Sequence, residues 1–309
     1  MRRAVIDLGT NTFHILIADR LQDDYKIVYK EKVPVKIGEG GIELKQITDS
    51  AIDRALKAVK HFEALISKYE VDDVKCIATS AFRNAENGEK LAEMIKANSG
   101  IDVHIIDGQT EASLVLEGVK KAIDLDEDAS LVIDIGGGSV EVIIADRNQK
   151  YWSESFEIGA QRLLDKFHKS DPITIDEIIS IDEYFESTFS KLEQAITEFQ
   201  PKILIGSSGT FDTLIEIYYA EKSIEKPANQ SGYELSRKDF NLIYDELISK
   251  NREERMEIPG MIEMRVDMIV VAVQLIRFLL EKFNFDLIKI SSYALKEGLL
   301  YSELHNKEV

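Results

Sequence analysis

Two stretches of the chain share the same pattern of apolar and polar positions. In each, a run rich in Val and Ile ends in an aspartate, a turn of Gly, Asn, Thr or Ser follows, and a second apolar run begins. β-Branched runs favour strands, and a Gly-rich piece between two such runs favours a tight turn. The pattern therefore predicts two β-hairpins, Ala4–Ala18 (AVIDLGTNTFHILIA) and Leu131–Ala145 (LVIDIGGGSVEVIIA).

The two predicted hairpins align residue by residue. Asp7 falls on Asp134, Gly9 on Gly136 and Thr12 on Ser139. Asp and Gly are common in ordinary turns, but a shared acid, glycine, hydroxyl and apolar frame favours an internal duplication. Glycine lets backbone N–H groups approach an anion closely. We therefore expect two phosphate-binding loops that face each other across a cleft.

The remaining pattern alternates helices with short buried strands, so the fold class is α/β. Each hairpin is followed by a third strand, and two helices are expected to open with capping boxes at Ser50–Asp53 and Thr174–Glu177, the second running to about Phe199. The same order of elements in both halves predicts two duplicated domains. We place domain I at residues 1–122, completed by a C-terminal helix over 294–309, and domain II at 123–293.

Composition narrows the classes of partner. The chain has 309 residues, a formal net charge of -18 and a pI of about 4.8, which disfavours nucleic acid and anionic membranes as partners. A polyanionic substrate would need local basic residues and metal ions. The single cysteine, Cys76, fits a reducing compartment. Asp7 and Gly9 interrupt the first apolar run, so no secretory signal is expected, and we predict a cytoplasmic protein.

The candidate chemistry consists of carboxylates and Gly/hydroxyl loops. The GxxxxGK[ST] loop is absent, the GGG turn is followed by a strand and not a helix, and no histidine pair has metal-ligand spacing. The inventory that remains suits phosphoryl transfer, with Asp7, Asp134 and Glu141 as hard oxygen ligands for Mg²⁺. Phosphate oxygens are expected at the backbone N–H groups of Gly9–Thr12, Gly136–Ser139 and Gly209–Thr210.

Four further features could have either a structural or a functional role. Arg83 follows a predicted strand, where ligands gather in open α/β sheets, but it could also be a surface arginine. Glu111 lies in the first turn of a predicted helix, where an acid complements the helix dipole. His14 aligns with Glu141, and a structural histidine is favoured there. The loop Lys36–Gly41 is either a flexible connection or a functional loop.

The motifs together resemble those of the exopolyphosphatase and guanosine pentaphosphate phosphohydrolase family, within the superfamily of actin-like ATPases, sugar kinases and heat-shock chaperones. The resemblance extends through almost the whole chain. It rests on DLGTNTFH, ATSAFRNAENG, IIDGQTEASLVLEGV, VIDIGGGSVEV, GSSGT and SSYALKEGLLYSEL. It implies two actin-like (ribonuclease H-like) domains with a cleft between them, without the additional C-terminal helical domain of longer family members.

The resemblance also implies roles for individual residues. The Gly-x-x-Glu-Ala piece makes Glu111 the general base that activates water, and Arg83 matches an arginine that contacts phosphate. The residues that match the two phosphate and metal motifs are Asp7, Gly9, Asn11 and Thr12 in the first, and Asp134, Gly136, Gly137, Ser139 and Glu141 in the second.

The implied activity is hydrolysis of the terminal phosphoryl group of inorganic polyphosphate with Mg²⁺. Guanosine pentaphosphate is the alternative substrate, and a non-hydrolytic nucleotide-binding module or a kinase of the same superfamily is the alternative of another class. The family often forms dimers, so a homodimer is an open option. The segment Met261–Gln274 keeps Arg265 and Asp267 but lacks the small residues expected nearby, which leaves that side of the predicted cleft open.

Overall fold

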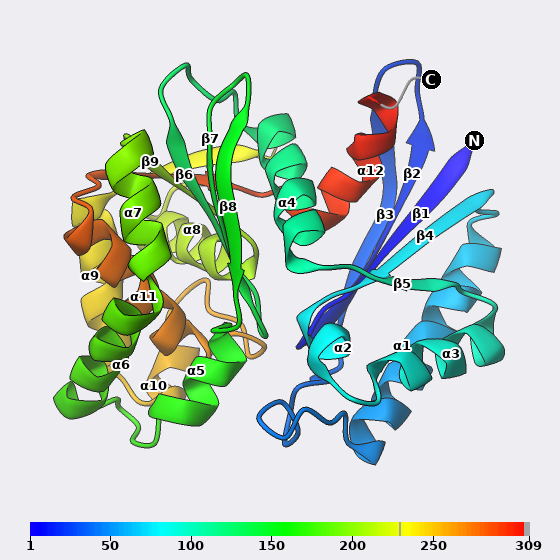
Figure 1. Ribbon diagram of the computed structural model, residues 1–309, viewed down its shortest axis with the longest axis horizontal. Coiled ribbons are helices and arrows are strands. Elements are labelled where there is room, and N and C mark those ends of the chain that lie inside the picture. Colours follow the sequence, from blue (N-terminus) through cyan, green and yellow to red (C-terminus); the bar gives the residue numbers. More distant parts are fainter. Residues whose placement is uncertain (229, 306–309) are drawn as a thin grey trace. The chain divides into compact units, whose positions relative to one another are not determined.

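The computed structural model describes residues 1–228 and 230–305, which divide into two compact units. Unit 1 comprises Met1–Gly118, Gly137–Ser139 and the C-terminal segment from Leu295. Unit 2 comprises Val119–Gly136 and Val140–Ala294. Each unit is built on one twisted sheet covered by helices (Figure 1).

Unit 1 has a five-stranded mixed sheet in the order β3-β2-β1-β4-β5. β2 is antiparallel to both β1 and β3, whereas β4 and β5 run parallel to β1. The strands are β1 (Arg2–Leu8), β2 (Thr12–Arg20), β3 (Tyr25–Pro34), β4 (Asp73–Ala78) and β5 (Val103–Ile105).

Unit 2 repeats this order. Its six-stranded sheet runs β8-β7-β6-β9-β11, and β10 is added antiparallel at the β11 edge. The pairing of the second strand with the third even shows a register irregularity at aligned positions, Ile17/Ala18 and Ile144/Ala145. The predicted duplication and the actin-like α/β fold class are thereby confirmed. The strands are β6 (Ser130–Ile135), β7 (Val140–Ala145), β8 (Lys150–Phe156), β9 (Ile203–Ser207), β10 (Gly232–Ser236) and β11 (Leu287–Ser291).

In unit 1, the two faces of the sheet are covered by different helices. α1 (Asp49–Lys68) and α3 (Gly88–Ser99) pack on the face formed by Ala4, Ile6 and Leu8 of β1. α4 (Gly108–Ala122) and α12 (Leu295–His305) lie on the other side of the sheet (Figure 1). A Cβ on Gly298 of α12 would lie 1.7 Å from the carbonyl oxygen of Leu114, so only glycine permits this helix crossing. The short α2 (Ser80–Asn84) follows β4.

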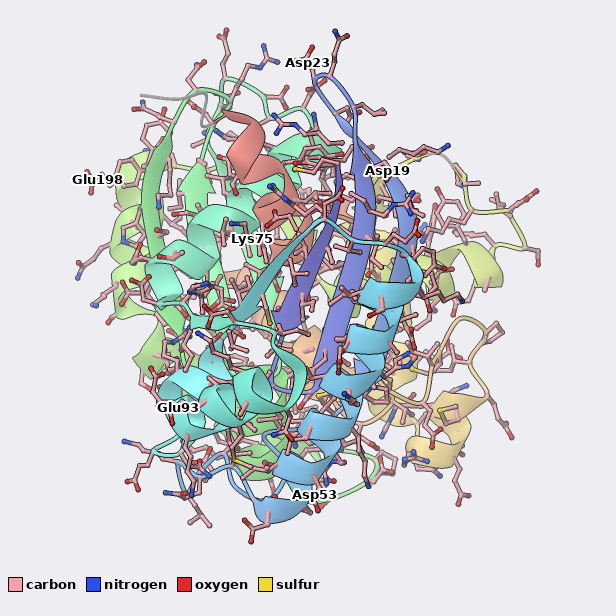
Figure 2. The ribbon with its side chains drawn as sticks, turned by 90° about the vertical axis from the view of Figure 1, so that its right-hand side faces the viewer. Asp19, Asp23, Asp53, Lys75, Glu93 and Glu198 are labelled. Carbon is pink, nitrogen blue, oxygen red and sulfur yellow. The ribbon has the colours of Figure 1, made fainter. Side chains whose placement is uncertain are left out.

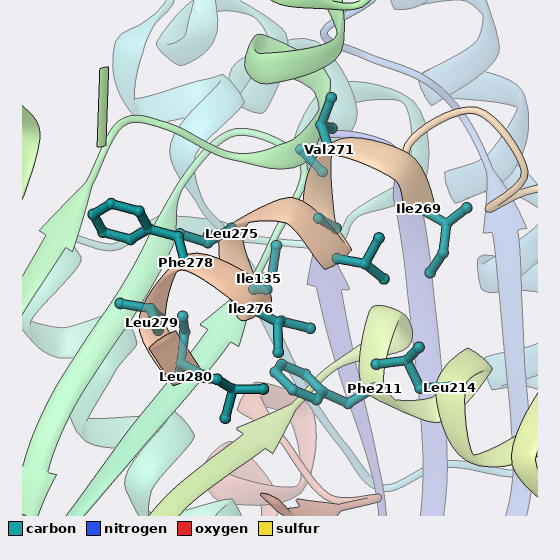
Figure 3. Packing of buried hydrophobic residues seen from close by; sticks show 14 of the residues in the cluster. Ile135, Phe211, Leu214, Ile269, Val271, Leu275, Ile276, Phe278, Leu279 and Leu280 are labelled. Carbon is teal, nitrogen blue, oxygen red and sulfur yellow. The ribbon is translucent and has the colours of Figure 1, made fainter. Parts of the chain in front are cut away.

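In unit 2, the core surrounds α11 (Ile269–Lys282), which is apolar on nearly every side. Its side chains pack in one cluster with those of β6 and α8 (Gly209–Glu221), as Ile135, Phe211 and Ile276 show in Figure 3. A helix that is apolar all round must be buried, which agrees with the predicted buried helix. The other helices are α5 (Ala160–Phe167), α6 (Ile175–Thr188), α7 (Ser190–Phe199), α9 (Arg237–Ser249) and α10 (Arg252–Met256).

Two of the predicted helix boundaries are wrong. α1 is capped by Thr48, whose side chain accepts a hydrogen bond from Ala51 N at 3.3 Å, and not by Ser50. The single helix predicted to run to Phe199 is two helices that break at Phe189. The hydroxyls of Ser187 and Thr188 both donate to the carbonyl of Tyr184, competing with helical hydrogen bonds at the break. The short β10 and α10 carry no strong periodicity and were not predicted.

The surface reflects the acidic composition. Asp53 on α1 and Glu93 on α3 are exposed acids on the outer helices of unit 1 (Figure 2). Among the residues described, no helix combines the length and apolar character needed to cross a bilayer.

The capping box of α6 gives a prediction on stability. Burial raises the pKa of Glu177, but backbone N–H groups of Thr174, Lys169 and Ser170 donate to its carboxylate and lower the pKa to about 2. Glu177→Gln should therefore destabilise the protein by about 1–2 kcal/mol at pH 7. Because the folded pKa lies below the usual 4.5, this difference should shrink as the pH falls from about 4.5 towards 2. Urea unfolding at several pH values measures it.

The matched control is Glu183→Gln, an exposed glutamate on the same helix. Its unfolding free energy should follow that of the wild type at every pH. A Glu177→Gln penalty that is constant between pH 7 and pH 3 would contradict the argument.

Candidate active site

The β1–β2 hairpin separates core residues from candidate site residues by strand alternation. Ile6, Leu8 and Phe13 face the core of unit 1. Asp7 and Thr12 occupy the alternate positions, so their side chains belong to the opposite face. The predicted acid and hydroxyl of the first motif are therefore on one face of one sheet.

The turn between these strands is held by backbone hydrogen bonds. The carbonyl of Asn11 accepts from Val35 N at 2.9 Å and from Lys36 N at 2.8 Å, and the carbonyl of Thr10 accepts from Gly38 N at 3.2 Å. Because the C=O and N–H of one peptide point in opposite directions, the amides of Asn11 and Thr12 point away from the Lys36–Gly41 loop. This is the arrangement that an anion-binding turn needs.

The Lys36–Gly41 loop is thus a support for the first phosphate loop. Arg54 of α1 holds the same segment, donating to the carbonyl of Val35 at 2.7 Å and to that of Lys36 at 2.8 Å. These hydrogen bonds argue against the interpretation of the Lys36–Gly41 loop as a flexible connection.

The structure brings Arg83 and Glu111 together within unit 1. Arg83 Nη1 lies 2.9 Å from Glu111 Oε2 and also donates to the carbonyl of Ile106 at 3.0 Å. Glu111 is only 6% exposed, in the first turn of α4. A glutamate that merely complements a helix dipole is normally exposed, so burial beside an arginine favours a site residue.

The start of α4 is fixed by Asp107. Its Oδ1 accepts from Thr110 N at 2.7 Å, and this backbone hydrogen bond, with a smaller contribution from Arg83, lowers the pKa of Asp107. The capping interaction sets the position of the first turn, and with it the backbone of Glu111.

In unit 2, the β6–β7 hairpin places two acids opposite each other. Asp134 pairs with Glu141 in the antiparallel register, so both side chains lie on one face. Asp134 is 6% and Glu141 2% exposed. Ser207 Oγ donates to Asp134 Oδ2 at 3.0 Å, and Ser155 Oγ donates to Glu141 Oε1 at 2.7 Å.

These hydroxyl donors were not predicted. Ser155 lies directly opposite Glu141 in the β7–β8 pair, so a predicted strand register would have indicated it. Ser207 pairs with Asp134 between the parallel strands β6 and β9, a contact that local sequence does not reveal.

The chemistry of this pair fits a divalent cation. Two like charges buried side by side are costly unless a cation or a proton compensates them. Mg²⁺ typically binds through one or two carboxylates, completed by water and substrate phosphates. Among the residues described, no group of three His, Cys, Asp or Glu side chains could hold a metal ion. Asp134 and Glu141 stay candidate metal ligands, and the third predicted ligand, Asp7, belongs to unit 1.

The other glycine and serine positions of the second motif lie in the β6–β7 turn. Gly136 follows β6 and its carbonyl accepts from Ala160 N at 2.9 Å. Ser139 is 2% exposed. By its contacts, the piece Gly137–Ser139 counts with unit 1 and not with the strands that flank it.

The third predicted anion site already contains an arginine. Gly209 opens α8, and a Cβ there would lie 1.9 Å from Arg265 Nη2, so the guanidinium rests directly on the glycine. Arg265 Nε is buried and has no hydrogen-bond partner among the residues described. Burial lowers the pKa of Arg265, while the carboxylates of Asp212 and Asp134 oppose that shift.

Arg265 is therefore a further candidate for an anion site, and the motifs alone did not select it. A buried guanidinium with an unused donor at a helix N-terminus is suited to an anionic oxygen. Thr210, predicted with Gly209, is 2% exposed in the first turn of α8.

Comparison with known proteins identifies the family of this chain. The family model described as "Ppx/GppA phosphatase family" matches residues 16–307. The crystal structure of an exopolyphosphatase from Cytophaga hutchinsonii is 44% identical, covers 100% of this chain and 99% of its own, and superposes with a TM-score of 0.96. The Aquifex aeolicus member of the Ppx/GppA family is 25% identical, with 100% and 99% coverage and a TM-score of 0.81.

A relative named for a different activity also matches this chain. "Guanosine-5'-triphosphate,3'-diphosphate pyrophosphatase" of Pseudoalteromonas translucida is 26% identical over 99% of this chain. The chain spans 60% of the length of that relative.

The Arg83–Glu111 contact gives a prediction on stability that is independent of activity. Arg83→Met leaves a buried carboxylate without its guanidinium and should lower the free energy of unfolding by about 2–3 kcal/mol. Adding Glu111→Gln removes the buried negative charge and should recover part of the lost unfolding free energy. The coupling energy between the two substitutions should be about 1–2 kcal/mol. Urea unfolding of the two single variants and the double variant measures it. Strictly additive effects would mean that the two side chains do not interact.

Proposed function

The chain belongs to the Ppx/GppA phosphatase family and is a phosphoanhydride hydrolase, and we propose that it removes the terminal phosphoryl group of inorganic polyphosphate with Mg²⁺ and Glu111 as general base. The observation that carries this proposal is the buried Glu111 held at 2.9 Å by Arg83 in the unit that also contains the Gly9–Thr12 loop. The whole-length likeness to a protein described as an exopolyphosphatase favours polyphosphate as the substrate.

The roles of the residues follow from their chemistry. Glu111 accepts the proton of the attacking water, and Arg83 holds that carboxylate in place and stabilises negative charge on the transferred group. The amides of Asn11 and Thr12 bind phosphate oxygens, as do the turns at Gly136–Ser139 and Gly209–Thr210. Little covalent chemistry is required, because phosphoryl transfer depends mainly on positioning and charge stabilisation.

Asp134 and Glu141 would hold the Mg²⁺. When bound, the ion neutralises charge on the phosphate oxygens. Ser207 and Ser155 each donate to one of these carboxylates and hold it in a single orientation.

Guanosine pentaphosphate is the second candidate substrate. The observation that favours it is the match to the relative named for guanosine-5'-triphosphate,3'-diphosphate. Both substrates present a terminal phosphoanhydride to the same groups. Phosphate release from each, measured with the purified chain in Mg²⁺ and again after chelation, decides between them. Release in water alone also separates a hydrolase from a kinase, since a kinase would need an acceptor.

Replacement of the general base gives the main prediction on turnover. Glu111→Gln keeps the size of the side chain and should lower kcat for phosphate release by about 10²–10⁴-fold, because the amide cannot accept the proton. Substrate binding should persist. The matched control is Glu117→Gln on the same helix, which should leave kcat unchanged. Wild-type turnover in Glu111→Gln would show that Glu111 is not the general base.

The glycine under Arg265 gives a prediction on substrate affinity. Gly209→Ala should displace the guanidinium, because the new Cβ would occupy its position. If Arg265 binds a phosphate of the substrate, both Gly209→Ala and Arg265→Ala should raise KM by about tenfold, the effect of one charge-assisted hydrogen bond. Steady-state kinetics on polyphosphate measures it. An unchanged KM in Arg265→Ala would show that this arginine is purely structural.

A further inference from the structure

The proposed mechanism uses neither Gly9, whose N–H donates to the carbonyl of Thr12 at 3.2 Å, nor His14. His14 lies on β2, two residues after Thr12 and on the same face of the sheet. Its Nε2 is 2.9 Å from Thr12 Oγ1. Its cross-strand neighbours are Asp7 on β1 and Lys32 on β3. The ring therefore contacts the hydroxyl of a residue whose backbone amide the proposed function assigns to phosphate.

The hydrogen bond between these side chains has two directions with opposite consequences. A threonine hydroxyl has one proton and two lone pairs. If Thr12 donates to His14, the hydroxyl presents a lone pair to the substrate, and a phosphate oxygen is repelled. If His14 Nε2–H donates to Thr12, the hydroxyl proton is directed to a phosphate oxygen. Only the second arrangement lets the Thr12 hydroxyl join its backbone amide as a phosphate ligand.

We propose that His14 is a positioning residue that donates from Nε2 to Thr12 Oγ1 and thereby directs the Thr12 hydroxyl proton to a phosphate of the substrate. This inference rests on the proposed function, in which Thr12 binds phosphate. It requires the tautomer protonated at Nε2. His14 is not itself a catalytic residue, because it acts only through Thr12.

The second hairpin supports this division of labour. Glu141 occupies the position of His14, opposite the motif aspartate in each case, and Ser139 occupies the position of Thr12. Glu141 can only accept, and it does so from Ser155. A carboxylate at this position suits a cation, whereas a ring N–H suits a hydroxyl that must donate to an anion. The residues at this duplicated position, His14 and Glu141, thus suit different ligands.

Four variants, assayed by phosphate release from inorganic polyphosphate, test the proposal. His14→Leu removes both ring nitrogens and should raise KM by about five- to tenfold with little change in kcat. His14→Gln places an amide N–H near the position of Nε2 and should restore KM to within about twofold of wild type. His14→Asn places its amide near Nδ1 and should not. Thr12→Val should raise KM at least as much as His14→Leu.

The double variant His14→Leu/Thr12→Val shows whether His14 acts through Thr12. Its KM should equal that of Thr12→Val alone. A further increase in the double variant, or equal KM values for the Gln and Asn variants, would overturn the proposal. Thr12→Val with an elevated KM and His14→Leu with a wild-type KM would overturn it while leaving the proposed function intact. A wild-type KM in Thr12→Val would show that the Thr12 hydroxyl does not bind phosphate, and it would overturn the role of His14.

Discussion

The alternation of side chains along two hairpins is the constraint on which the rest of the structure depends. A strand directs successive residues to opposite faces, so Ile6 and Leu8 enter one core while Asp7 lies on the other face. The same rule separates Ile133 and Ile135 from Asp134. A shift of one residue in register would exchange the two sets of side chains and bury the acid in the apolar core. The hydrophobic core and the candidate chemistry are therefore specified by the same pairing.

Burial of acids is the second constraint, and each unit meets it differently. Unit 1 compensates Glu111 with the guanidinium of Arg83. Unit 2 supplies hydroxyl donors to Asp134 and Glu141, and the guanidinium of Arg265 interacts electrostatically with Asp134. In a chain with a net charge of -18, the general field repels a polyanion. The proposed polyanionic substrate therefore needs cations that act at short range, where a low dielectric strengthens their attraction.

Much of the fold could be predicted because it depends on local patterns. The hairpins, the α6 capping box and the apolar α11 each follow from periodicity or from residues within a few positions of each other. The break at Phe189 could not be predicted in this way. The ring packs on Phe156 and Phe278, which are distant in sequence, and tertiary packing overrides the helical pattern there.

The same distinction applies to the candidate site. Glu111 and Arg83 were indicated by motifs, but their contact joins residues 28 positions apart. Arg265 was visible only as a residue in an atypical segment, and its position over Gly209 depends on the packing of unit 2. Motifs report the residue types that a chemistry needs. The partners that orient those residues come from other strands and helices, so local sequence does not specify them.

The duplicated hairpins share most of their motif and differ at the residue opposite the aspartate. Both hairpins keep the aspartate, the glycine, the hydroxyl and even the register irregularity between the second and third strands. What differs is the residue opposite the aspartate, His14 in one and Glu141 in the other. In the proposed mechanism, the residue at this position offers a ring N–H to Thr12 in the first hairpin and a carboxylate to Mg²⁺ in the second.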